Sequence, residues 1–136
     1  MRVTKDQTIE AKMSAYIQQM PDDVIIRAEV AHLGSPRQIS RGFKALVQKG
    51  VIVKLGYGIY AKMVKFEGFE PLFLKNGFIG TAVAALEKLN VPWEPSQATK
   101  DYNAGLTTQV PVSPKVKINS RFNRKIAYKG TPLRFE

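Results

Sequence analysis

Residues 35–63 decide the fold that this sequence predicts, and they read SPRQISRGFKALVQKGVIVKLGYGIYAKM. The stretch opens with a helix start signal, because Ser35 is a good N-cap residue, Pro36 suits the first helical position and Gln38 completes a capping box. Gly50 is a typical helix stop. We therefore expect a helix that begins at Pro36 and ends just before Gly50.

This predicted helix has an apolar face and a basic face. The apolar face follows the i, i+4, i+7, i+8 spacing of a core-facing stripe and consists of Ile39, Phe43, Leu46 and Val47. The second face follows the spacing i, i+4, i+7, i+11, contains no acid, and consists of Arg37, Arg41, Lys44 and Gln48. A basic face of this kind suits an anionic partner such as nucleic acid.

A β-hairpin is expected directly after the helix. Residues 51–54 form an apolar run that ends in a lysine, residues 55–58 hold two glycines for a tight turn, and residues 59–61 return. The apolar run at residues 24–26 is expected to be a strand that pairs with this hairpin. A basic helix followed by a glycine-turned hairpin is the layout of a winged helix-turn-helix.

Two further helices are expected before this stretch, over residues 7–19 and 27–33. The first has a core stripe of Ile9, Met13, Tyr16, Ile17 and Met20. The second stops at Gly34, which leaves a turn as tight as a helix-turn-helix requires. The sequence therefore predicts an α+β fold with three parts: a winged helix-turn-helix domain at 1–63, a packed connector at 64–77, and a small α+β domain with a short antiparallel or mixed sheet at 78–136.

The connector is expected to be irregular, because Gly68 and Pro71 interrupt it, and its aromatic side chains are expected to pack rather than to form a partner patch. Beyond it we expect a helix over 79–89, an extended segment over 91–95, and a short helix capped by Ser96 that runs to Asn103. The β-rich runs expected after these helices are 109–112, 115–119, 124–129 and 132–135.

The charge of the chain is concentrated in two blocks. The 136 residues carry a formal net charge of +10. Residues 27–65 hold eight Lys and Arg against one Glu, a net charge of +7, and residues 111–136 hold seven against one Glu, a net charge of +6. An excess of Lys and Arg that is concentrated in two blocks favours an acidic partner, nucleic acid above all.

The residue types exclude several kinds of chemistry. With no cysteine, the chain cannot build a disulfide, a zinc finger or a Cys–His pair. Its one histidine, His32, is expected at the surface or at a helix end, so we expect neither a Ser–His–Asp triad nor a His-rich metal site. The chain also has no phosphate-binding glycine motif. We expect neither an enzyme nor a cofactor or metal site. The polar start and the lack of a long apolar run predict a cytoplasmic protein without a membrane partner.

The basic helix supplies the first candidates for DNA contact, because a winged helix places this helix in the major groove. Arg37 and Arg41 suit bidentate contact with guanine, and Gln38 suits adenine. The residues expected to contact base edges or phosphates nearby are Ser35, Ser40, Lys44 and Gln48. The hairpin offers Lys54, Tyr57 and Lys62 to the backbone or minor groove, and the basic C-terminal sheet offers Lys115, Lys117, Arg121 and Arg124.

The sequence also resembles a known family. Residues 34–60 resemble the N-terminal winged helix of AbiEi-type antitoxins, with matches at Ala45, Leu46, Gly50, Ile52, Gly58, Ile59 and Tyr60. The second half is similar at residues 84–87 (AALE), 93–96 (WEPS) and 105–111 (GLTTQVP). The resemblance implies a bacterial DNA-binding repressor of its own operon that opposes a nucleotidyltransferase toxin encoded beside it. It places Arg37, Gln38, Arg41 and Lys44 at recognition-helix positions.

Longer members of that family continue with further helical segments after the sheet. A short form is expected to keep DNA binding and to lose toxin neutralisation, or to have no toxin partner. The prediction is thus a sequence-specific DNA-binding transcriptional regulator of the antitoxin type. The alternative is a protein-interaction antitoxin or adaptor that neutralises a nucleotidyltransferase toxin and binds DNA only non-specifically. The expected partner is double-stranded operator DNA. An operator with inverted repeats would suit either a dimer or two monomers that bind side by side.

Overall fold

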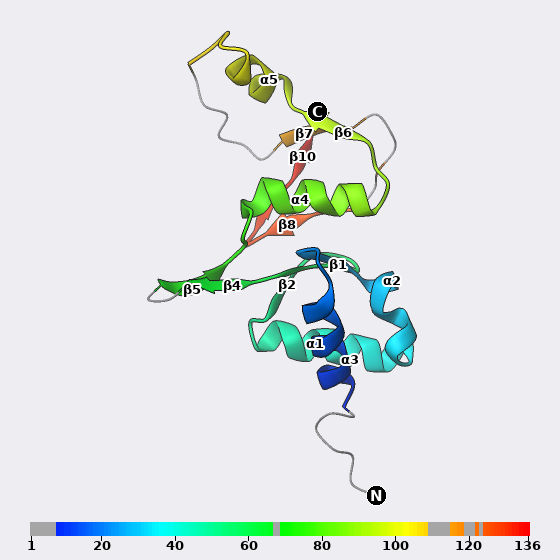
Figure 1. Cartoon of the computed structure of the whole chain (residues 1–136). Helices are drawn as coiled ribbons and strands as arrows, with labels where there is room; N and C mark the ends of the chain where they lie inside the picture. The colour runs from blue at the N-terminus through cyan, green and yellow to red at the C-terminus, as the bar shows by residue number, and fades with distance from the viewer. Residues whose placement is uncertain (1–7, 67–68, 109–114, 119–121, 123) are drawn as a thin grey trace, which may run out of the picture. The chain divides into compact units, whose positions relative to one another are not determined.

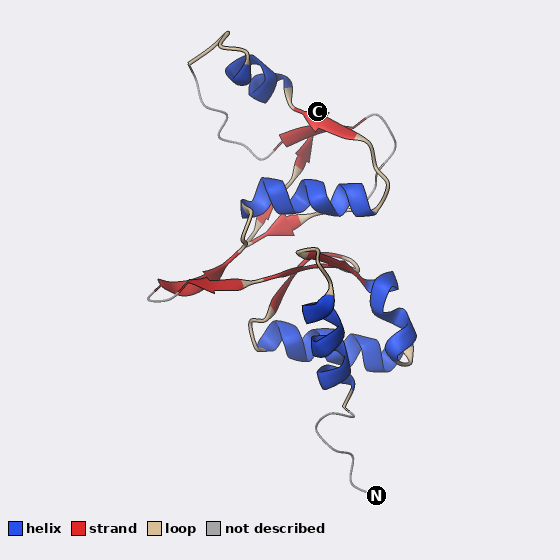
Figure 2. Ribbon diagram, in the orientation of Figure 1, coloured by secondary structure: helices blue, strands red, loops and turns tan. Residues whose placement is uncertain are grey.

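The computed structural model describes residues 8–66, 69–108, 115–118, 122 and 124–136, and the chain divides into two compact units, Met1–Lys75 and Asn76–Glu136 (Figure 1). Helices and short strands occur in both units (Figure 2). The α+β class that the sequence predicts is therefore confirmed.

The first unit contains three α-helices, one 3₁₀ turn and five strands among its described residues. In chain order these are α1 (Ile9–Gln19), β1 (Val24–Ile26), α2 (Arg27–Val30), the 3₁₀ helix η2 (Ala31–Leu33), α3 (Pro36–Gln48), β2 (Ile52–Gly56), β3 (Ile59–Lys62), β4 (Val64–Phe66) and β5 (Phe69–Phe73). The helix expected over residues 27–33 is thus a single α-turn followed by a 3₁₀ turn. Helix α3 ends just before Gly50, as expected, and the φ of 76° at Gly50 is one that glycine adopts without strain.

Strands β1, β3 and β2 form an antiparallel sheet in that order, with β3 in the middle. Tyr60 lies opposite Ile25 on one side and opposite Lys54 on the other. The predicted pairing of residues 24–26 with the hairpin is therefore confirmed. The hairpin turns through Tyr57 and Gly58, and Gly58 has a φ of 70°.

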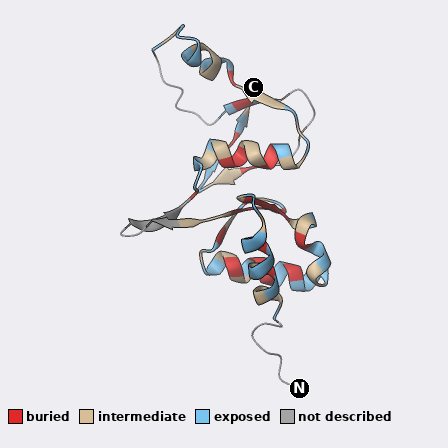
Figure 3. Ribbon diagram, viewed as in Figure 1, coloured by how far each residue is buried: buried red, intermediate tan, exposed pale blue. Residues whose placement is uncertain are grey.

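One hydrophobic cluster joins this sheet to α1 and α3 (Figure 3). Its buried members are Met13, Ile17, Ile25, Val30, Ile39, Phe43, Leu46, Ile52 and Tyr60. The apolar stripe predicted for α3 therefore faces the core, with Val47 partly buried at its edge. Tyr16 departs from its prediction: it is 37% exposed, and its ring meets the ring of His32 edge-on at a centroid distance of 5.0 Å.

The expectation of an irregular connector was wrong, because β4 and β5 form an antiparallel hairpin. Val64 lies opposite Phe73, and Phe66 lies opposite Phe69. A two-stranded hairpin leaves one edge of each strand unpaired, and a proline such as Pro71 is tolerated at such an edge because no N–H has to be donated there. The aromatic side chains of residues 65–73, for which we expected packing, lie outside the described part of the structure.

The second unit contains α4 (Gly77–Lys88), β6 (Trp93–Pro95), α5 (Gln97–Asn103), β7 (Lys115–Ile118), β8 (Ala127–Tyr128), β9 (Thr131–Pro132) and β10 (Arg134–Phe135). Strand β7 pairs antiparallel with β6 and parallel with β10, so this sheet is mixed, one of the two arrangements expected. Ser96 caps α5 as predicted by accepting the N–H of Thr99 at 3.3 Å. The β-run predicted over residues 109–112 lies outside the described residues.

The short strands β8 and β9 are joined by Lys129 and Gly130, which both have positive φ, 50° and 80°. Two positive φ values are typical of the type I′ turn that suits the twist of a tight hairpin. Of the β-run expected over residues 124–129, only Ala127–Tyr128 is a strand.

The crossing of α1 and α3 gives a first testable prediction. Gly42 is buried on α3, and a Cβ added there would overlap the sulfur of Met13 on α1. In an open helix, Gly→Ala stabilises by up to about 1 kcal/mol. For Gly42→Ala we expect the opposite sign, a loss of about 1–3 kcal/mol in the free energy of unfolding, because the fully buried Met13 side chain or the helices themselves must shift to make room for the added methyl group. Urea denaturation measures this change, and an increase in stability would contradict the close crossing.

Candidate functional site

The first turn of α3 is fixed by a reciprocal capping box. The Ser35 hydroxyl accepts the N–H of Gln38 at 3.2 Å, and the Gln38 side-chain oxygen accepts the N–H of Ser35 at 2.9 Å. The box that the sequence predicts is therefore confirmed. It also engages the Gln38 oxygen that a bidentate contact with adenine would use, so both side chains serve the helix before any ligand binds.

Four side chains form an exposed row along α3, and we refer to Arg37, Arg41, Lys44 and Gln48 as the α3 stripe. The opposite side of the helix buries Ile39, Gly42, Phe43 and Leu46. No acid occurs in α3, and no ion pair of the described residues includes a member of the stripe. The stripe therefore presents three positive charges to solvent without compensation from its own helix.

The three hairpin residues predicted as site members differ in their surroundings. Lys54 on β2 is exposed, and Tyr57 at the turn has 81% of its surface exposed. Lys62 on β3 is half-buried, and its ammonium donates a hydrogen bond to the carbonyl oxygen of Met20 at 2.6 Å. Lys62 thus ties the hairpin to the end of α1, whereas Lys54 and Tyr57 extend toward solvent.

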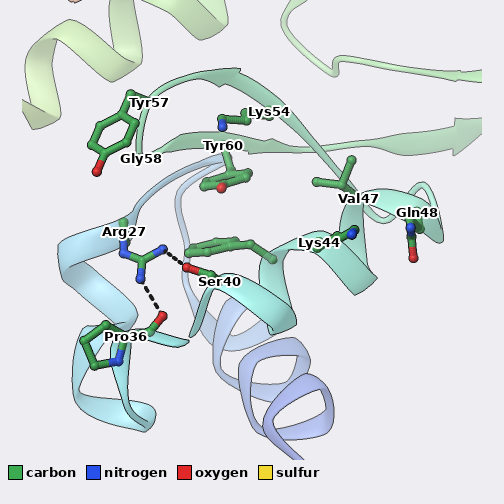
Figure 4. A pocket seen from close by; sticks show the side chains of 11 residues that line it. Arg27, Pro36, Ser40, Lys44, Val47, Gln48, Lys54, Tyr57, Gly58 and Tyr60 are labelled. Atoms are coloured by element: carbon green, nitrogen blue, oxygen red, sulfur yellow. Dashed lines mark hydrogen bonds between the residues drawn. The ribbon is translucent and has the colours of Figure 1, made fainter. Parts of the chain in front are cut away.

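Helix α3, the hairpin and the first residue of α2 line a half-open pocket of about 780 Å³, which we call the α3–hairpin pocket (Figure 4). Its lining consists of Arg27, Pro36, Ser40, Phe43, Lys44, Val47, Gln48, Lys54, Tyr57, Gly58 and Tyr60. Five of these, Ser40, Lys44, Gln48, Lys54 and Tyr57, are residues that the sequence predicts as site members. The structure therefore brings helix and hairpin candidates to one cavity.

Arg27 also lines this pocket. From the sequence it counted only as one of the basic residues, and it was not predicted as a site residue. Its guanidinium donates one hydrogen bond to the Ser40 hydroxyl at 3.0 Å and another to the carbonyl oxygen of Pro36 at 2.8 Å (Figure 4). Both partners lie in the first turns of α3. The two bonds hold a half-buried cation at the pocket wall, and both accepting oxygens are neutral.

Tyr60 forms the inner wall of the pocket, whereas the sequence indicated it only as a residue of the returning strand and as a match to the antitoxin family. Its ring stacks on that of Phe43, with a centroid distance of 3.9 Å and an angle of 2° between the ring planes. Burial raises the pKa of the Tyr60 hydroxyl, and the positive charge of Arg27 partly opposes this rise. The hydroxyl therefore stays protonated to higher pH than in an unfolded chain.

The C-terminal candidates lie in the second unit. Lys115 and Lys117 are exposed on β7 on either side of buried Val116, and Arg124 is half-buried before β8. Arg121 lies outside the described residues. In the sheet register Lys117 lies opposite Glu94, whose pKa is lowered first by its hydrogen bond and ion pair with Lys100 and in smaller part by Lys117. The face expected to be basic therefore also carries a carboxylate.

Among the described residues, no three His, Asp or Glu side chains gather as metal ligands, and none of the helices has the length and apolar content needed to cross a bilayer. Comparison of the chain with protein-family models, with curated proteins and with solved structures finds no match. The family resemblance noted in the sequence thus remains a prediction.

The raised pKa of Tyr60 predicts a loss of stability in alkali. The folded state holds the proton of the Tyr60 hydroxyl more tightly than the unfolded state does. The contribution of this proton to the free energy of unfolding is therefore complete below the unfolded pKa of about 10, and it is lost as the pH rises through the folded pKa. Tyr60→Phe keeps the ring and removes the titrating group. We expect the free energy of unfolding to fall more in the wild type than in Tyr60→Phe between about pH 9 and about pH 11. Denaturant titrations at both pH values measure this, and equal losses would show that Tyr60 is not responsible.

Proposed function

We propose that this chain is a sequence-specific DNA-binding regulator and that its first unit works as a winged helix-turn-helix. The observation that carries the proposal is the acid-free α3 stripe, which is exposed beside a hairpin whose Lys54 and Tyr57 are also exposed. A duplex presents phosphates and acceptor-rich base edges together, and this surface offers donors to both.

In this proposal α3 is the recognition helix and lies in the major groove. The guanidinium groups of Arg37 and Arg41, one turn apart, donate two hydrogen bonds each to guanine O6 and N7. Lys44 and Gln48 extend the contact along the helix. The hairpin is the wing, and its Lys54 neutralises a backbone phosphate, which adds affinity without sequence information.

The regulatory role that fits best is that of an AbiEi-type repressor of its own operon. It is supported by the sequence resemblance over residues 34–60 and by the net charge of +10. A nucleotidyltransferase toxin encoded nearby is then the protein partner. Lys115 and Lys117, exposed in the second unit, add contacts to the DNA backbone.

Arg41 provides the test of base readout. We expect Arg41→Ala to weaken binding to the best DNA site by about 1–3 kcal/mol and to reduce the preference among single-base variants of that site, because a bidentate contact with guanine is lost. Competition assays against a panel of site variants measure both effects. Lys12→Ala, which removes one exposed cation from α1, is the matched control and should leave the preference intact. Unchanged affinity and preference in Arg41→Ala would show that α3 does not read base edges.

Lys54 should behave differently from Arg41. A phosphate contact is the same on every sequence, so Lys54→Ala should weaken specific and non-specific duplexes by similar factors. It should also reduce the slope of log K against log salt by about 1. Salt titrations of both duplexes with the wild type and the variant give these slopes. A loss confined to the specific duplex would place Lys54 on base edges instead of the backbone.

A further inference from the structure

The α3–hairpin pocket is a concave site, and contact between α3 and a DNA groove does not require such a site. Its volume of about 780 Å³ lies in the range of roughly 300–1,000 Å³ that is typical of small-ligand sites. Arg37 and Arg41 are absent from its lining, whereas Pro36, Ser40 and Val47 on the neighbouring side of α3 belong to it. The pocket is therefore a site beside the face proposed to read base edges, with Lys44 and Gln48 at their common border.

The charge of the pocket favours an anion. Arg27, Lys44 and Lys54 come from α2, α3 and β2, and the lining contains no Asp or Glu. Arg27 is already positioned, because hydrogen bonds to Ser40 and Pro36 hold its guanidinium. A guanidinium has five N–H donors, so these two bonds leave three, and its planar fork suits the oxygens of a phosphate.

The rest of the lining favours a planar ring. Phe43, Val47 and Tyr60 give the pocket an apolar wall, and Tyr57 stands at its edge with 81% of its surface exposed. Figure 4 shows the Tyr57 side chain reaching from the hairpin turn toward the side on which Arg27 lies. An exposed tyrosine ring near a cationic wall is the combination on which nucleobases stack in nucleic-acid-binding proteins.

We infer that the α3–hairpin pocket binds a nucleotide, with its phosphate at Arg27, Lys44 and Lys54 and its base against Tyr57. The site goes beyond the proposed function, since it does not require base readout by the α3 stripe. Its phosphate has two possible sources, a free nucleotide or one unit of a nucleic-acid strand. Both share the same recognition chemistry, and the experiment separates them.

The first measurement is an NMR titration of the full chain with AMP, observed at the backbone amides and at the arginine side-chain N–H groups. We expect saturable shifts at Arg27 and Tyr57, and weaker binding of adenosine and of inorganic phosphate, each of which supplies half of the contacts. Arg27→Gln should weaken AMP binding about tenfold, and Tyr57→Ala should weaken it about fivefold or more, because charged hydrogen bonds or base stacking are lost. Lys12→Gln, an exposed cation outside the pocket, should leave AMP binding unchanged.

Tyr57→Ala keeps the test valid if Arg27→Gln fails to fold, because Tyr57 is exposed at a turn. No saturable shift at the pocket, or equal AMP affinity in the wild type and both folded variants, would overturn the inference. Tyr57→Ala alone with unchanged AMP affinity would overturn the assignment of the base.

A competing single-stranded oligonucleotide of random sequence at low salt identifies the source of the phosphate, because its bases, unlike those of a duplex, are available to stack on Tyr57. If the oligonucleotide displaces AMP and Tyr57→Ala also weakens oligonucleotide binding, the pocket holds a strand nucleotide. If AMP still binds beside the oligonucleotide, the pocket holds a free nucleotide; both results support the site. Loss of AMP binding alone would leave the Arg41→Ala effects on DNA in place, whereas AMP binding without sequence-specific DNA binding would reject only the proposed function.

Discussion

The stacked rings of Phe43 and Tyr60 join α3 to its sheet, and the candidate site depends on this contact. The rings lie 3.9 Å apart and parallel to within 2°, and Phe43 and Tyr60 are only 1% and 7% exposed. Because Tyr60 lies on the middle strand and Phe43 on the inner side of α3, the pair sets the spacing between helix and hairpin and hence the width of the pocket. From the other side, the close approach of Met13 to Gly42 fixes α3 against α1.

On this scaffold the positive charges around the α3–hairpin pocket have little to offset their mutual repulsion. Like charges around one pocket repel each other, and Arg27, Lys44 and Lys54 have no acid among the other lining residues to offset them. Hydrogen bonds to the neutral oxygens of Pro36 and Ser40 compensate Arg27 only in part. A bound phosphate would relieve this repulsion, whether it comes from a duplex in contact with the α3 stripe or from a nucleotide in the pocket.

Local signals in the sequence were sufficient for α3 and the hairpin. The capping box at Ser35 and the turn at Gly58 each depend on residues within a few positions, and helical periodicity gave the exposed row on α3. The same reasoning missed what distant contacts decide. Arg27 reaches acceptors nine and 13 residues away, so its role appears only once α2 and α3 are packed. The hairpin around residues 64–73 was missed because Pro71 is a strand breaker in general but is tolerated where a strand has one unpaired edge.

The central claim is that the first unit reads DNA sequence, and selection of bound fragments from sheared host DNA tests it most directly. At about 150 mM salt most purely electrostatic binding is suppressed, so enrichment that survives reports readout of bases or shape. The account predicts a sharp peak of enriched fragments upstream of the gene that encodes this chain. Uniform recovery across the genome would contradict it and would assign the basic surfaces to a partner other than a specific DNA site.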